Sequence, residues 1–506
     1  MYSKNRLPMK PYDVAIIGSG LGGLASGVML SREGMRVCIL EQQAVVGGCF
    51  QSFCRRGYRL DTGIHYVGSL DEGQTMYQYF KYLGIVDRLN LQRLDEEAFD
   101  VMCFTDGMRY AHAMGYERFV NRLSEAFPHE RAGLQDYCRK LQQVGGLIKP
   151  DVLRSGVLSS GGMEYMGLSA RQEIADSIRD ERLRNVLAGN NLLYSGLAKK
   201  SSFYEHAMIN HSNIEGAHCF VGGTQQVADA LVEEIRRHGG DVYTRAAVTS
   251  IHLEGDRVTY LEINGGEERI EAKEVIAAIH PLRMLELLEN NTIIKRAFFS
   301  RVRALENSFG LFTTYLMMKP GRWPYQARNY YLHNTSDVWN RQADYRGCNI
   351  STVLLCMQPD EARRSTEVIT LLTPMPYEML ARWEESRTGH RGEEYEAFKA
   401  HYAACITAFA EAFFPGLREA VAAVEVASPL TYRDYTATPQ GSAYGIVKDY
   451  HNPIVSHLSA RTKIGNLFLT GQNLNVHGCL GVAVSAAVTC SELLGVEYLA
   501  KKIGHA

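Results

Sequence analysis

The sequence lacks the features that mark several classes of protein. Its 11 cysteines form no C-x-x-C pair and no Cys/His pairing at zinc spacing, which argues against a structural metal and against a disulfide framework. No window reaches the roughly 18 uninterrupted apolar residues that a membrane span requires, and Met1 to Lys10 hold no apolar stretch of the signal-peptide kind. We therefore expect a cytoplasmic protein without a metal site, and leave open a shallow, peripheral contact with a membrane surface.

The sequence also has too few clustered basic residues to attract nucleic acid. The formal net charge is −2, and basic runs are short, as at Arg55-Arg56 and Lys199-Lys200. Hydrophobic residues make up 46% of the 506 positions, so the chain can bury more than one core. A chain of this length predicts two or more domains.

A glycine-rich turn near the N-terminus carries the strongest signal. A predicted strand over Tyr12 to Ile17 leads into Gly18-Ser19-Gly20-Leu21-Gly22-Gly23, and a second predicted strand ends at Glu41. Gly18 allows a tight turn, and Gly20 allows backbone N–H groups to approach a pyrophosphate closely. Gly23 allows the following helix to pack close to the sheet. Glu41 lies about 20 residues further on, where a carboxylate accepts from ribose hydroxyls. The pattern predicts a dinucleotide at the start of a helix.

The residues after Glu41 indicate which dinucleotide this is. A second glycine pair, Gly47-Gly48, follows, and then an aromatic-Asp-x-Gly strand over Gly57 to Gly68. A nicotinamide dehydrogenase does not need that pair. The stretch resembles the large flavoprotein group that holds amine oxidases and carotenoid desaturases, in which it runs along FAD.

Two later blocks complete this unit. Phe220 to Gln226 precede a predicted helix that stops at Gly239-Gly240, followed by short strands as far as Ala278. Near the C-terminus, an apolar strand ends at Gly471, and a helix of small residues is expected to start around Gly481.

The fold class predicted from these blocks is α/β. A Rossmann-like FAD-binding domain, three-layered with a parallel central sheet, would be assembled from residues 1–90, 215–290 and 430–506. Residues 91–214 and 291–429 would form an α+β substrate-binding domain. Within it we predict strands at Leu311 to Leu316 and Val353 to Met357, and an amphipathic helix from Tyr395 to Phe413 whose aromatic stripe faces the core.

Two stretches carry a narrower likeness. Asp61-Thr62-Gly63-Ile64-His65-Tyr66-Val67-Gly68 and Gly471-Gln472-Asn473-Leu474-Asn475-Val476-His477-Gly478 together resemble the all-trans-retinol 13,14-reductase (retinol saturase) branch of the phytoene desaturase and carotenoid isomerase family. The order of segments agrees along the whole chain. The resemblance implies an FAD-dependent oxidoreductase that acts on CH–CH groups of a hydrophobic polyene or isoprenoid.

The resemblance also implies which residues hold the cofactor. In chain order these are Gly18, Gly20, Leu21, Gly22, Gly23, Glu41, Gln42, Gly47, Gly48, Val248, Gly471, Gln472, Gly478, Gly481 and Val482.

This chain departs from the family pattern at two positions. Many relatives have an arginine soon after the glycine pair, where this chain has Cys49-Phe50-Gln51-Ser52, so Arg55 or Arg56 would have to replace it. Most relatives have an acid where Gln472 stands, although an amide makes the same hydrogen bond. The retinol saturase branch shares this glutamine.

Reduction of a C=C bond needs hydride from the flavin and a proton from elsewhere. The candidate catalytic residues are His65, His477 and Tyr66, since all lie in segments expected to pass near the flavin. The alternative for each histidine is a hydrogen bond that only locks a loop.

Saturation is the favoured reaction, with NAD(P)H as one possible electron donor. The alternatives are a desaturase, a cis–trans isomerase, and a flavin-bound lipid carrier without catalysis. An amine oxidase ranks below them, because the two motif stretches do not resemble that branch. The sequence does not indicate the natural substrate or the oligomeric state.

Overall fold

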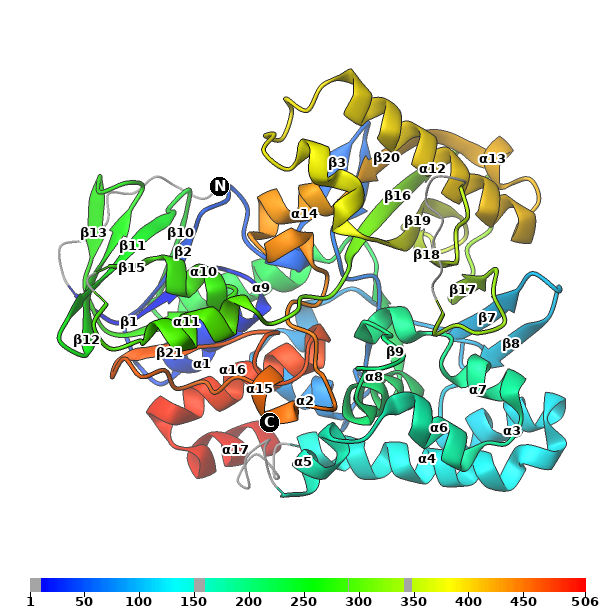
Figure 1. The fold of residues 1–506 in the computed structure, drawn as a ribbon, viewed down its shortest axis with the longest axis horizontal. Helices are drawn as coiled ribbons and strands as arrows, with labels where there is room; N and C mark the ends of the chain where they lie inside the picture. Colours follow the sequence, from blue (N-terminus) through cyan, green and yellow to red (C-terminus); the bar gives the residue numbers. More distant parts are fainter. Residues whose placement is uncertain (1–10, 150–159, 290, 341–347) are drawn as a thin grey trace.

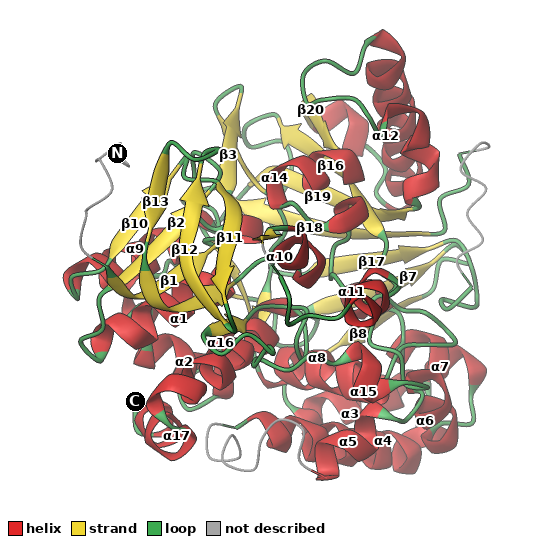
Figure 2. Cartoon of the chain, turned by 60° about the vertical axis from the view of Figure 1, so that its left-hand side comes forward, coloured by secondary structure: helices red, strands yellow, loops and turns green. Residues whose placement is uncertain are grey.

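Two large sheets organise the molecule, and each takes its strands from widely separated parts of the chain (Figures 1 and 2). The computed structural model describes residues 11–149, 160–289, 291–340 and 348–506.

The first sheet is parallel throughout, in the order β10-β2-β1-β14-β21. Its strands are β1 (Tyr12–Ile17), β2 (Val37–Glu41), β10 (Asp241–Thr244), β14 (Ala272–Ala277) and β21 (Leu467–Leu469). They come from the three stretches assigned above to the FAD-binding domain.

Alternate side chains of β1 enter different layers, as the two-residue period of a strand requires. Val14 and Ile16 pack with the helices α1 (Leu21–Arg32), α9 (Gln225–Arg237) and α16 (Gly478–Leu494). Ala15 and Ile17 pack with an antiparallel sheet on the opposite face. That sheet holds β11 (Val248–Glu254), β12 (Arg257–Ile263) and β13 (Glu268–Ile270), with the short β15 (Leu288–Glu289) at its edge. The predicted three-layer, Rossmann-like architecture is therefore confirmed.

The second sheet has seven strands in the order β20-β16-β19-β18-β17-β7-β8. Its strands are β7 (Asp100–Phe104), β8 (Arg109–His112), β16 (Gly310–Met318), β17 (Asn329–His333), β18 (Thr352–Pro359), β19 (Thr366–Met375) and β20 (Val421–Ala427). The strands predicted at Leu311 to Leu316 and Val353 to Met357 are thus confirmed.

Helices cover both faces of this sheet (Figure 2). The long helix α12 (Glu393–Phe413) buries Tyr395, Tyr402 and Ile406 against one face, so its aromatic stripe is core. The other face packs on α4 (Arg131–Gly145), α7 (Glu181–Leu187) and α8 (Phe203–Glu215).

Smaller elements surround or connect the two sheets. They include the strands β3 (Ser52–Arg55), β4 (Tyr58–Asp61), β5 (Val67–Gly68), β6 (Leu91–Arg93) and β9 (Ala217–Phe220), and the helices α2 (Thr75–Tyr82), α3 (Tyr116–Ala126), α5 (Ser160–Met166), α6 (Ala170–Ser177), α10 (Pro281–Glu286), α11 (Arg296–Arg303), α13 (Leu417–Ala420), α14 (Pro429–Thr436), α15 (Pro453–Ser456) and α17 (Val496–Gly504). The carboxylate of Asp61, which is 2% exposed, links β3 to the segment before α9. It accepts hydrogen bonds from Ser52 Oγ at 2.6 Å and from the backbone N–H of Thr224 at 2.9 Å.

The structure adds two details that the sequence did not give. Helix α16 begins at Gly478, earlier than the expected start at Gly481, because Gly478 itself makes the turn into the helix with a φ of +78°. The cysteines form no disulfide framework among the described residues, but one pair that the sequence did not indicate, Cys348 and Cys405, 57 residues apart, is joined. Spacing along the chain could not predict this contact between a loop and a helix. Cys49 and Cys54 are free thiols.

Among the described helices, none has the length and apolar character needed to cross a bilayer.

Candidate functional site

The glycine-rich turn closes tightly on itself. Gly18 has a φ of +97°, which favours glycine. A Cβ added at Gly23 would lie 2.1 Å from the carbonyl oxygen of Gly18, so no larger residue fits there. The first turn of α1 therefore lies directly on the end of β1, with its free N–H groups at the mouth of a crevice.

The C-terminal glycine segment meets this turn. A Cβ at Gly22 would lie 3.1 Å from the Cα of Gly471. Gly48 approaches from the other side, where an added Cβ would be 3.2 Å from the Cα of Gly20. Three segments that are distant in the sequence thus form one glycine-lined cradle.

A crevice runs from this cradle toward α16, with a volume of about 1530 Å³ when the open solvent at its mouth is included. The predicted cofactor residues that line it are Gly18, Gly20, Leu21, Gly22, Glu41, Gln42, Gly47, Gly48, Val248, Gly471, Gln472, Gly478 and Val482. Gly23 lies behind the turn, and Gly481 lines an adjoining cavity. Glycine backbone at the phosphate end and a length that joins all three segments fit an extended dinucleotide such as FAD.

The carboxylate of Glu41 links the glycine-rich turn to the segment that follows β2. One carboxylate oxygen accepts from the backbone N–H and the hydroxyl of Ser19, at 3.0 and 2.6 Å. The other oxygen accepts from the backbone N–H of Gln43 at 2.8 Å. Glu41 is 7% exposed and lines the crevice, and its carboxylate has lone pairs beyond the three that these bonds use.

The arginines expected to replace the missing family arginine do not line the crevice. The guanidinium of Arg55 donates to the carbonyl of Cys54 at 3.0 Å and lies over the ring of Phe53. Arg56 occupies the exposed hairpin turn with a φ of +49°. Arg283, on α10, does line the crevice. The sequence reasoning missed it, because α10 follows the fourth strand of the sheet and carries no motif.

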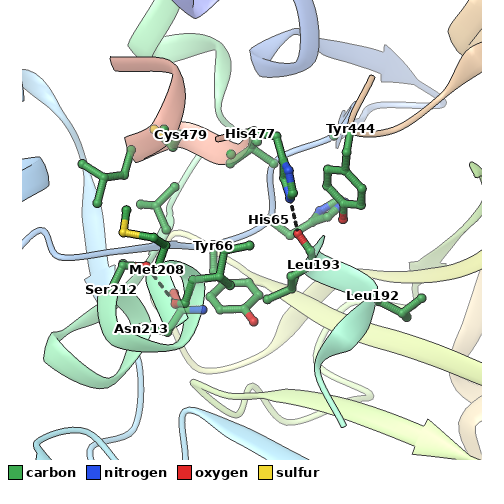
Figure 3. Close-up of a pocket in the computed structure, with 18 of the residues that line it drawn as sticks. His65, Tyr66, Leu192, Leu193, Met208, Ser212, Asn213, Tyr444, His477 and Cys479 are labelled. Carbon is green, nitrogen blue, oxygen red and sulfur yellow. Dashed lines mark hydrogen bonds between the residues drawn. The ribbon is translucent and has the colours of Figure 1, made fainter. Parts of the chain in front are cut away.

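A second cavity, of about 980 Å³ when the open solvent at its mouth is included, shares a wall with the crevice. Five residues line both spaces: Gly63, Ile64, Tyr444, Gly478 and Cys479. The rest of the wall is mainly apolar, from Leu192, Leu193, Met208, Leu311, Leu354, Leu372, Val476 and Leu480 (Figure 3). A long apolar molecule can therefore lie end-on to whatever occupies the inner part of the crevice.

His65 lies in the wall of this second cavity (Figure 3). Neither ring nitrogen has a hydrogen-bond partner among the described residues. Burial lowers the pKa of the imidazole to about 4, so the ring is neutral near pH 7. It keeps one donor and one acceptor for a ligand.

His477 is held firmly in place. Its Nδ1 lies 3.2 Å from Oε1 of Glu205 on α8, and its Nε2 lies 2.7 Å from the carbonyl oxygen of Leu193. The side chains of His477 and Glu205 are only 2% and 3% exposed. Both neighbours are acceptors, so the ring of His477 is held between a carboxylate and a backbone carbonyl. Glu205 was missed from the sequence, since nothing there links α8 to the C-terminal motif.

Tyr66 also lines the cavity, but its hydroxyl points away from the two histidines (Figure 3). The hydroxyl donates to Oδ2 of Asp100 at 3.0 Å and lies 2.6 Å from the hydroxyl of Tyr331. Asn329 donates to the other oxygen of Asp100 at 3.0 Å. Burial raises the pKa of Asp100 to about 7 and that of Tyr66 well above its ordinary value.

Comparison with known proteins gives a family and several relatives. Residues 21–357 match the family described as flavin containing amine oxidoreductase. The chain is 27% identical to all-trans-retinol 13,14-reductase of Macaca fascicularis, over 97% of this chain and 87% of that protein. It is 22% identical to prolycopene isomerase 1 of an Oncidium hybrid cultivar, over 96% of this chain and 84% of that protein.

A solved oxidoreductase from Methanosarcina mazei has the same fold. It superposes with a TM-score of 0.61 at 17% identity, covering 94% of this chain and 98% of that one. The predicted resemblance to the retinol 13,14-reductase branch is confirmed by the sequence match.

Proposed function

Since the chain belongs to the flavin containing amine oxidoreductase family, we propose that it reduces a carbon–carbon double bond in a hydrophobic polyene or isoprenoid. It is an FAD-dependent oxidoreductase. The observation that carries the substrate class is the apolar cavity that shares Gly63, Ile64 and Gly478 with the cofactor crevice. The reductase named among its relatives supports saturation as the direction.

The chemistry that FAD would supply when bound at the crevice in its reduced form is hydride for one carbon of the double bond. The chain itself has three tasks. Its apolar walls exclude water and align the polyene, which places the reacting carbons at the shared wall. The ion pair of His477 with Glu205 fixes the loop that leads into α16. The remaining task is to deliver a proton to the neighbouring carbon.

We assign that proton to His65. Its neutral ring can donate from one nitrogen while the other accepts a replacement proton, and both nitrogens are free of protein partners among the described residues. Tyr66 is a weaker candidate, because its hydroxyl is already engaged with Asp100 and Tyr331.

Anaerobic incubation tests the reaction. The FAD-loaded protein is reduced with dithionite and mixed with a retinoid or a carotenoid, and the products are analysed by mass spectrometry. A product two hydrogens heavier, with reoxidised flavin, supports saturation. An isomer of unchanged mass would refute it in favour of the isomerase, which a relative's name makes the second candidate. Desaturation gives a lighter product from oxidised enzyme, and a carrier leaves the flavin unchanged.

The electron donor is tested in the same assay. Replacing dithionite by NADPH or NADH shows whether NAD(P)H reduces the bound flavin, as the sequence allowed. Failure of both nucleotides would point to another donor and leave the saturation test intact.

A further inference from the structure

Two cysteines and a histidine meet in the lobe built on the seven-stranded sheet. His401 and Cys405 are four residues apart on α12, so their side chains lie on the same face of that helix. Cys348 precedes β18 and reaches the same point. The Nε2 atom of His401 lies 3.4 Å from Sγ of Cys348 and 3.7 Å from Sγ of Cys405. None of the three residues lines either cavity of the proposed active site.

We propose that in the reduced protein these three side chains bind one Zn²⁺. Thiolate sulfur and imidazole nitrogen are the ligands that zinc prefers, and three protein ligands leave a fourth position for water. Bonds of about 2.3 Å to sulfur and about 2.0 Å to nitrogen place S and N about 3.5 Å apart on a tetrahedron. The two observed separations, 3.4 and 3.7 Å, bracket that value.

The histidine distinguishes this cluster from a simple disulfide. A disulfide needs no histidine beside it. His401 is exposed, yet its ring nitrogen faces both sulfur atoms. Within the part of the chain that the structure describes, no other group of three His, Cys, Asp or Glu side chains converges closely enough to hold a metal ion. His401 and the two cysteines are also at least partly accessible, so the ion can enter from solvent.

The joined pair, Cys348–Cys405, is the oxidised and metal-free form of the site. A phosphine supplies the two electrons and water the two protons that break the S–S bond and give two thiols, and the phosphine takes the oxygen of the water to become its oxide. Each thiol then loses its proton as its sulfur binds the cation, so two protons are released. Two thiolates balance the double charge of the ion.

The test uses the full-length, FAD-loaded protein. It is reduced with a phosphine, desalted without oxygen and titrated with Co²⁺, whose d–d bands report tetrahedral thiolate coordination at wavelengths beyond the flavin absorption. We expect one Co²⁺ per chain, displaced by Zn²⁺, and no uptake before reduction. His401→Ala and Cys405→Ser should weaken binding at least about tenfold.

Matched controls are Cys54→Ser and His390→Ala, which alter an exposed thiol and an exposed imidazole elsewhere. Both should bind Co²⁺ as the parent protein does. His401 is exposed, so its alanine variant should fold and keep its flavin, which the flavin absorbance checks. Uptake unchanged in His401→Ala and Cys405→Ser would overturn the proposal. So would a reduced protein that takes up no cobalt, or a disulfide that phosphine leaves closed.

Discussion

Glu205→Gln is the sharpest probe of the buried ion pair beside the proposed active site. The substitution keeps the shape of the side chain but removes its charge. The two side chains are 3% and 2% exposed, and the carboxylate lies 3.2 Å from Nδ1 of His477. Removing one partner of such a pair leaves the other charge buried without compensation, which costs about 3–5 kcal/mol. We expect a loss of that size in the free energy of unfolding.

Lys448 adds to this effect. Its ammonium group is buried and donates to the carbonyls of Ser456 and Asn473, each at 2.8 Å. Burial lowers the pKa of Lys448 to about 7, while the charge of Glu205 raises it. Loss of the Glu205 charge should therefore lower the pKa of Lys448 further and weaken the link between residues 448 and 473.

The assay is denaturant unfolding of the FAD-loaded protein, with Glu262→Gln as the matched control. Glu262 lies 3.3 Å from His252, but those two side chains are 22% and 18% exposed. Solvent screening should limit that loss to about 1 kcal/mol or less. A double-mutant cycle with His477→Gln isolates the pairwise energy. Equal losses at Glu205 and Glu262, or a coupling energy below about 0.5 kcal/mol, would refute the reasoning.

Three further predictions concern the crevice, the buried acid and the proton donor. Gly23→Ala should abolish FAD retention, measured by flavin absorbance, because its Cβ would lie 2.1 Å from the oxygen of Gly18; Gly146→Ala, with open space around the added Cβ, should retain FAD. The pKa of Asp100, about 7, is above its ordinary value of about 3.9. Its stabilising contribution is therefore complete below about pH 4 and lost as the pH rises through 7, by up to about 4 kcal/mol. Asp100→Asn should remove that slope from pH-dependent unfolding curves, and an unchanged slope would exclude Asp100 as its source. His65→Gln should lower kcat by about 10²–10⁴ without loss of flavin, and full activity would eliminate His65 as the proton donor.

The FAD-binding elements could be predicted because their physics is local. The turn from Gly18 to Gly23 needs particular backbone angles, and the strands on either side need alternating burial. Both requirements are visible in the types of consecutive residues. The helix from Tyr395 to Phe413 was predicted for the same reason, since its apolar residues follow the helical period. The start of α16 was placed too late, because Gly478 begins the helix with a backbone angle that the sequence pattern does not reveal.

Partners from distant segments could not be predicted in this way. Glu205 and His477 are 272 positions apart by their residue numbers. No motif around either residue indicates that the two side chains are in contact. Arg283 lines the crevice although no motif marks it, and Arg55, which the motif spacing suggested, points elsewhere. The contact of Cys348 with Cys405 and His401 was missed for the same reason. The residue boundaries of the two domains, the cytoplasmic location and contact with a membrane stay predictions.

The sequence by itself determined the cofactor class, the Rossmann-like layers and the family resemblance, because each depends on residues that are neighbours along the chain. Tertiary structure decided the environment of each candidate catalytic group. Among the described residues it left both nitrogens of His65 without a hydrogen-bond partner, and it paired His477 with Glu205 and turned the hydroxyl of Tyr66 toward Asp100. Burial and hydrogen bonding control the protonation of these groups, and both arise only when segments far apart in sequence pack together.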